Sequence, residues 1–209
     1  MSSTYKKMAI KERAELARIS NQLSKASPAR LPPMILMTDP TIHYDVRQSA
    51  LAMPDETTII YRHFGAREKL EVAHILRQIT FKKNQKLLIG HDADLAIECG
   101  ADGVHFKRDA NLILPMLWRQ RCPNWIITMA GLKDKHVYKG DLSVLDGLFI
   151  SSVFPSQSPS AGYAIGVEAF QKRVATTMVP VIALGGINAR TAPSLLQTGA
   201  AGLAGRFKL

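Results

Sequence analysis

The chain has 209 residues, of which 46% are hydrophobic and 21% charged, a composition typical of one globular domain and not of a disordered chain. Lys and Arg outnumber Asp and Glu by 27 to 17, and the formal net charge of +10 favours anionic ligands such as phosphate esters. No apolar run reaches the length of a membrane span, and the polar N-terminus lacks a secretory signal, so we expect a cytoplasmic protein without a membrane partner.

The cysteines and the basic residues indicate no specialised binding motif. Cys99 and Cys122 have no metal-ligand spacing, and two cysteines suit a reducing compartment better than a disulfide scaffold. The basic residues are scattered over several segments, without a zinc finger or an aromatic RNA-binding signature. We therefore predict no metal site from these residues, and a soluble basic surface rather than a nucleic-acid-binding one.

The first thirty residues predict a helix and a linker. No Pro or Gly occurs from Tyr5 to Lys25, and Ser27-Pro28 ends the helical pattern. We therefore divide the chain into an N-terminal helix and linker over residues 1–30 and a main domain over residues 31–209. Apolar residues recur on one face of the predicted helix, at Tyr5, Ala9, Leu16, Ile19 and Leu23.

From residue 34 onward, short apolar runs alternate with segments of helical periodicity. The predicted strands cover residues 34–37, 57–61, 86–89, 103–106, 125–129, 147–154, 181–184 and a run that ends at Gly205. The predicted helices cover residues 44–53, 67–81, 92–99, 112–121, 134–144, 167–177 and 191–197. About eight such units predict an α/β fold, a (β/α)8 TIM barrel. A doubly wound open sheet is the alternative, but no Gly-x-Gly-x-x-Gly turn follows the first strand.

The two ends of the chain make a joint prediction. Only Phe207, Lys208 and Leu209 follow the eighth strand, so we expect no C-terminal eighth helix. The extra N-terminal helix is then predicted to pack across the eighth and first strands, burying Leu16 and its apolar neighbours. The alternative is a basic arm that reaches a second subunit or a nucleic acid, which leaves a homo-oligomer open.

Glycines follow the last two predicted strands. Gly185 and Gly186 end one apolar run and Gly205 ends the next, so backbone N–H groups there can approach an oxyanion closely. Asn188 is a predicted N-cap for the helix over residues 191–197, whose N-terminus would add positive potential. We predict a phosphate site here; the alternative is that the glycines only form tight turns.

Five phrases, in order along the chain, add a family resemblance: Leu87-Leu88-Ile89, Asp94-Leu95-Ala96, Gly100-Ala101-Asp102-Gly103-Val104-His105, Ser152-Val153-Phe154-Pro155-Ser156 and Ala183-Leu184-Gly185-Gly186-Ile187. Together they resemble the thiamine phosphate synthase and TenI (thiazole tautomerase) superfamily. The resemblance implies a (β/α)8 barrel with its site at the C-terminal strand ends. It implies a synthase that joins hydroxymethylpyrimidine diphosphate to thiazole phosphate with Mg²⁺, releasing pyrophosphate, or a tautomerase that isomerises a thiazole carboxylate phosphate.

Most of the family's catalytic residues are replaced in this sequence. Of the Gln-x-Arg-x-Lys pattern after the second strand only the arginine remains, as Arg62. At the two magnesium carboxylates the chain has His91 and Ala110, so we expect that the free protein does not bind Mg²⁺ tightly. The Thr-x-Thr-Lys phrase after the sixth strand keeps its hydroxyls as Ser156 and Ser158 and loses its cation.

Polar residues at the strand ends supply the remaining candidates. Arg62, His63 and His91 are the predicted catalytic residues, because a strand-end arginine grips phosphate and histidine titrates near neutral pH. Arg206 joins the glycines and serines as a predicted phosphate-binding residue. His105 lies inside a strand and is predicted to pack or hydrogen-bond in the core.

Further candidates are weaker. Lys107 and Arg108 are alternative sources of positive charge, Tyr61 and Phe64 are alternatives for stacking on a heteroaromatic ring, and Asp39 either orients a ligand or shapes a turn.

Two hypotheses on function follow. The first is a thiamine phosphate synthase-like enzyme of thiamine biosynthesis. The second is a catalytically degenerate member that binds a small phosphorylated heteroaromatic ligand as a binding or regulatory protein.

Overall fold

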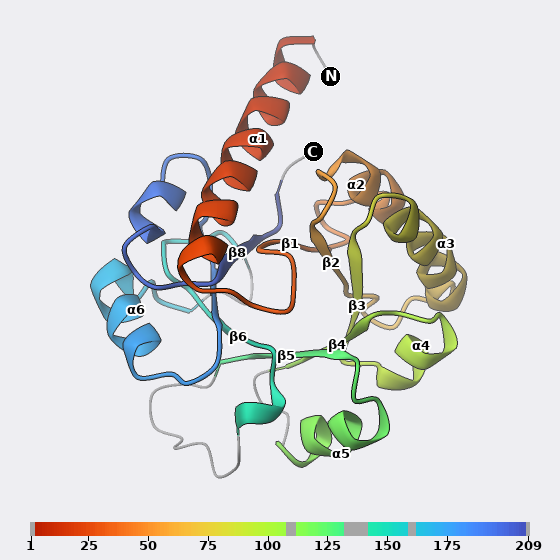
Figure 1. The fold of residues 1–209 in the computed structure, drawn as a ribbon. Helices are drawn as coiled ribbons and strands as arrows, with labels where there is room; N and C mark the ends of the chain where they lie inside the picture. Colours follow the sequence, from red (N-terminus) through yellow and green to blue (C-terminus); the bar gives the residue numbers. More distant parts are fainter. Residues whose placement is uncertain (1–2, 108–111, 132–141, 159–161, 208–209) are drawn as a thin grey trace.

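The computed structural model describes residues 3–107, 112–131, 142–158 and 162–207. Within these residues, eight parallel strands pair in chain order and close into a barrel (Figure 1). In the closing pair, Ile35 of the first strand lies opposite Ala204 of the last. The strands are β1 (Met34–Met37), β2 (Thr58–Tyr61), β3 (Lys86–Gly90), β4 (Gly103–Phe106), β5 (Ile126–Ala130), β6 (Gly147–Ile150), β7 (Val181–Leu184) and β8 (Gly202–Gly205).

Helices cover the outside of the barrel, as the alternating pattern predicted. They are α1 (Ser3–Ala26), α2 (Val46–Ala52), α3 (Lys69–Lys82), α4 (Ala93–Glu98), α5 (Ile113–Arg121) and α6 (Gly166–Ala175), with short 3-10 helices η1 (Leu142–Val144) and η2 (Ala192–Leu195). The prediction of a (β/α)8 barrel is confirmed, and the open sheet is excluded by the pairing of β8 with β1.

Alternate strand residues belong to two different parts of the core. Ile35, Ile60 and Ile182 belong to a cluster inside the barrel, whereas Leu36 and Ile59 pack outward with the helices. Successive strand residues face opposite sides, so this parity also sets where the first residues beyond each strand point.

The N-terminal helix packs against the strands that close the barrel, as predicted. Leu16, Ile19 and Leu23 of α1 are at most 1% exposed, and they share one cluster with Leu36 of β1 and Leu203 of β8. Figure 1 shows α1 beside β8 and β1, where no other helix lies. The helix therefore occupies the position that a C-terminal eighth helix would fill.

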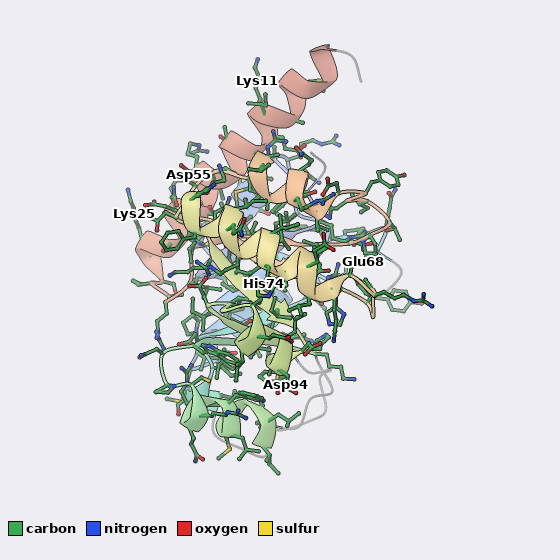
Figure 2. The ribbon with its side chains drawn as sticks, turned by 90° about the vertical axis from the view of Figure 1, so that its right-hand side faces the viewer. Lys11, Lys25, Asp55, Glu68, His74 and Asp94 are labelled. Atoms are coloured by element: carbon green, nitrogen blue, oxygen red, sulfur yellow. The ribbon has the colours of Figure 1, made fainter. Side chains whose placement is uncertain are left out.

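The first turns of α1 extend past the barrel. Met8 and Ile10 are more than half exposed, and Figure 2 shows Lys11 on this projecting part, far from Lys25 at the other end. Because α1 leads into β1 from the N-terminal end of the strands, its projecting end lies on the side where the strands finish.

Two predicted helices differ in the structure. Most of the helix predicted over residues 134–144 lies outside the described residues, and its end forms η1. The helix predicted over 191–197 is the four-residue η2: Pro193 lacks an N–H, and the N–H groups of Leu196 and Thr198 bond three residues back, to the carbonyl oxygens of Pro193 and Leu195. In the part of the chain that is described, no helix is long and apolar enough to cross a membrane.

Candidate functional site

A cavity of about 390 Å³ lies at the C-terminal ends of the strands. Its walls come from the ends of β1, β2, β6, β7 and β8, and from α1. In barrels of this architecture this end carries the ligand site, because the loops that follow the strands converge there. The walls include all six predicted phosphate-binding residues: Ser156, Ser158, Gly185, Gly186, Gly205 and Arg206.

The loop after β7 brings backbone donors to the cavity. Gly185 and Gly186 have φ angles of 96° and 68°, a conformation that strongly favours glycine. Within the described residues, the backbone N–H groups of Gly186 and Ile187 donate to no other protein group. Successive free N–H groups are the donors from which anion-binding concavities are built, and we call residues 185–188 the glycine loop.

The same glycines also allow close packing of two loops. A Cβ on Gly186 would lie 2.4 Å from the carbonyl oxygen of Pro155, and one on Gly185 would lie 2.8 Å from Cα of Ser152. The turn and the packing of the two loops therefore both require glycine here. A bulky residue at Gly186 would displace the β6 loop as well as any anion, so such a variant cannot test binding by itself.

The loop is held by short-range hydrogen bonds. Thr191 Oγ1 donates to the carbonyl oxygen of Gly186 over 3.0 Å, and Asn188 Oδ1 accepts from the backbone N–H of Arg190 over 2.9 Å. Asn188 is thus not the cap of an α-helix, and no helix of more than one turn directs its N-terminus at this loop. Its positive potential comes from the individual N–H groups.

Two arginines meet one carboxylate where β1, β2 and β8 end. Arg206 Nη1 donates to Asp39 Oδ2 over 2.9 Å, and Arg62 Nη2 lies 3.5 Å from the same oxygen. Burial raises the pKa of Asp39, but hydrogen bonds from Thr41 and Arg206 outweigh it and hold that pKa at about 2. Asp39 therefore stays ionised, orients both arginines and shapes the turn through Thr41.

Strand parity explains why Arg62 reaches the cavity and its neighbour does not. Ile60 faces the barrel interior, so Arg62, two residues on, lies above the interior and lines the cavity. Its Nε donates to the carbonyl oxygen of Thr38 over 2.7 Å, and its Nη2 is buried without a hydrogen-bond partner in the described structure. His63 has the opposite parity and pairs with Asp92, 3.3 Å away on the helix side.

The other predicted residues lie outside the cavity walls. His91 follows Gly90 at the end of β3 with a φ of 66° and is not among the residues that line the cavity. His105 is buried as predicted, with Nδ1 2.9 Å from Thr128 Oγ1. Lys107 is exposed, and Phe64 is exposed beneath the Arg62 guanidinium at 5.1 Å.

Tyr61 packs in the outer core. Arg108 and Ala110 lie outside the described residues.

Sequence reasoning missed two charged cavity residues, Glu12 and Arg13 of α1. We assigned α1 a packing role, yet Arg13 stands three residues before Leu16, on the face that turns toward the barrel. That spacing was the available signal. Burial lowers the pKa of Arg13, and the neighbouring Glu12 opposes this shift.

The described residues do not form a magnesium site. No group of three His, Cys, Asp or Glu side chains among them is arranged to hold a metal. The carboxylate of Asp39 is neutralised by Arg62 and Arg206, and Glu12 accepts from the backbone N–H of Ala189 over 3.4 Å. Magnesium prefers free carboxylate oxygens together with substrate phosphates, and this donor set does not fit it.

Comparisons with known proteins support one family. A family model described as thiamine monophosphate synthase matches residues 36–208. A thiamine-phosphate synthase of Pyrococcus furiosus is 27% identical over 82% of this chain and 83% of its own length, and one of Archaeoglobus fulgidus is 31% identical over 68% and 67%. Among solved structures, the thiamine phosphate pyrophosphorylase of Pyrococcus furiosus superposes with a TM-score of 0.68 and 28% identity, over 83% of this chain and 84% of that one.

Proposed function

Because the chain belongs to the thiamine monophosphate synthase family, we propose that it is a thiamine-phosphate-synthase-like enzyme of thiamine biosynthesis. It would join hydroxymethylpyrimidine diphosphate to thiazole phosphate. The proposal is supported by one observation: a single cavity is lined both by the glycine loop with Ser156 and Ser158 and by the paired arginines Arg62 and Arg206.

Each of these two groups of residues suits one phosphorylated substrate. The glycine loop has free N–H groups and, with the serines, suits the compact phosphate monoester of a thiazole phosphate. Arg62 and Arg206 suit the diphosphate, because guanidinium groups bind phosphate oxygens in pairs and keep their charge when partly buried.

In the proposed reaction, the bond from the pyrimidine methylene to the diphosphate breaks, and the thiazole nitrogen bonds to that carbon. Positive charge develops on the pyrimidine while negative charge concentrates on the departing diphosphate. Arg62 and Arg206 stabilise that negative charge, and Asp39 fixes their orientation before the substrate binds. Magnesium is part of the family's reaction, but the described residues do not fit it, so we derive no step through the metal.

The test is pyrophosphate release by the purified protein with both substrates, measured with and without added Mg²⁺. We expect turnover, and we expect Arg62→Gln to lower it by on the order of 100-fold because a preorganised charge is lost. Arg67→Gln is the matched control, since Arg67 is exposed in the same loop and does not line the cavity. Equal turnover of the two variants would remove Arg62 from the reaction.

The second candidate is a catalytically degenerate binding or regulatory protein. One observation favours it. Asp39, the carboxylate beside the arginines, is already paired with Arg206 and hydrogen-bonded to Thr41, so it is not a free ligand for the magnesium that the family's reaction uses. This candidate predicts that calorimetry detects binding of thiazole phosphate while no pyrophosphate is released under any metal condition.

A further inference from the structure

The glycine loop lacks a cation of its own. The polar groups of the cavity-lining residues in the β6 and β7 loops, as far as the structure describes them, are backbone, hydroxyl and amide groups, with no Lys or Arg side chain. A phosphate monoester carries between one and two negative charges near neutral pH. Neutral donors alone leave most of that charge uncompensated.

Arg13 is placed to supply the missing charge. It lines the same cavity from α1, and its Nη1 is buried without a hydrogen-bond partner among the residues that the structure describes. Arg62 and Arg206 both approach Asp39, whereas Arg13 forms no salt bridge with any residue that the structure describes. A partly buried guanidinium without an acceptor is unfavourable, and an anion in the cavity would relieve that cost.

The position of Arg13 is fixed from both sides along α1. Leu16, one turn on, is 1% exposed in the core between α1 and the barrel. Glu12, one residue before, accepts a 3.4 Å hydrogen bond from the backbone N–H of Ala189, directly after the glycine loop. The side chain between these two anchors is therefore held near the loop and not on a free arm.

We propose that Arg13 is a ligand-binding residue that grips the phosphate group seated on the glycine loop. The phosphate monoester is then held by backbone N–H groups of the loop and by the Arg13 guanidinium of α1. This helix precedes the family match, because the match begins at residue 36. The inference deepens the proposed function by naming how the monoester is recognised, and it rests on the glycine loop being the phosphate site.

The experiment measures the dissociation constant of inorganic phosphate, and then of thiazole phosphate, by calorimetry on the full chain. The variants are Arg13→Ala and Arg13→Lys. The matched control is Arg18→Ala, because Arg18 lies on the same helix, pairs with Glu15 on the surface and does not line the cavity. Melting temperatures without ligand establish that every variant is folded.

We expect Arg13→Ala to weaken binding of both ligands at least about tenfold, because a charge-assisted hydrogen-bonded contact is lost. Arg13→Lys should recover part of the affinity, since lysine restores the charge and not the paired geometry. Arg18→Ala should bind as the parent does, which separates a local contact from the general positive charge of the protein.

The outcomes separate this inference from the proposed function. If the parent binds phosphate and Arg13→Ala binds it equally well, the role of Arg13 is wrong and the glycine-loop site stands. If Arg13→Ala and Arg18→Ala weaken binding alike, long-range charge explains the effect, and the inference is also wrong. If the parent protein binds neither ligand, the inference and the proposed phosphate site fail together.

Discussion

At the scale of single residues, strand parity determines which polar groups meet the ligand side. Arg62 and Arg206 continue the inward parity of Ile60 and Ala204, and both line the cavity. His63 has outward parity and pairs with Asp92 instead. A role for His63 or His91 in catalysis stays a hypothesis that requires substrate to extend beyond the cavity walls.

His105 makes the stability of the barrel depend on pH. It is buried next to Phe149, and burial, reinforced by the charges of His91 and Arg62, lowers its pKa to about 3. Because the folded pKa lies below the unfolded value of 6.5, the unfolded chain takes up a proton first as the pH falls. Its stabilising effect is therefore complete above 6.5 and is lost progressively between 6.5 and 3.

We expect the free energy of unfolding, measured with urea, to fall between pH 7 and pH 4.5, with His105 contributing at most about 1.4 kcal/mol per pH unit. The variant His105→Gln cannot take up this proton, so its stability should change less over the same range. Identical pH dependence in parent and variant would show that other groups cause the loss.

At the scale of elements, α1 combines two roles. One face closes the hydrophobic layer over β8 and β1, and the same face carries Arg13 and Glu12 to the cavity. A helix that only covered these strands would need apolar residues alone on the face toward the barrel. Residues 1–30 thus differ from the barrel in sequence pattern, but α1 and the barrel strands share one hydrophobic core.

Two isoleucines of α1 test its packing. Ile19 is 0% exposed and Ile10 is 57% exposed, so the same substitution on the same helix removes a core contact in one case and a surface side chain in the other. We expect Ile19→Ala to cost about 2–5 kcal/mol of unfolding free energy and Ile10→Ala less than about 0.5 kcal/mol, measured by urea denaturation. Similar small effects would mean that α1 is not docked in solution.

At the scale of the whole molecule, the two outer core clusters meet. Leu16 and Leu36 belong to the cluster that includes α1, Val104 and Ile127 belong to the cluster under α5, and Trp125 packs against both. Because the barrel is closed, no strand has a free edge from which unfolding can begin. The molecule is therefore expected to unfold as one unit.

The two tryptophans of the chain report on this cooperativity. Trp118 and Trp125 stack at a centroid distance of 5.4 Å beside α5, across the barrel from α1 (Figure 1). Tryptophan fluorescence follows that side, whereas far-UV circular dichroism follows all helices, including the 24-residue α1. We expect both signals to change at the same urea concentration. A circular dichroism transition at lower urea would indicate that α1 detaches first.

Local pattern in the sequence determined most of the fold. Apolar periodicity identified the strands and most of the helices, including the amphipathic α1 that packs on β8 and β1. It failed at residues 191–197, where Pro193 lacks an N–H and the backbone forms hydrogen bonds three residues back, as in a 3-10 turn. The glycines of the cavity were also predicted, because their backbone demands are local, and the serines were predicted from the family resemblance.

Only the tertiary structure decided which charged groups meet. Arg62, Asp39 and Arg206 come together through the closure of β8 onto β1 and the pairing of β1 with β2, across up to 167 residues of chain. Arg13 reaches the cavity because α1 docks against that closed barrel. Periodicity says which face of an element is buried, but not which elements face each other. Charge contacts between distant segments are therefore fixed by barrel closure and helix packing.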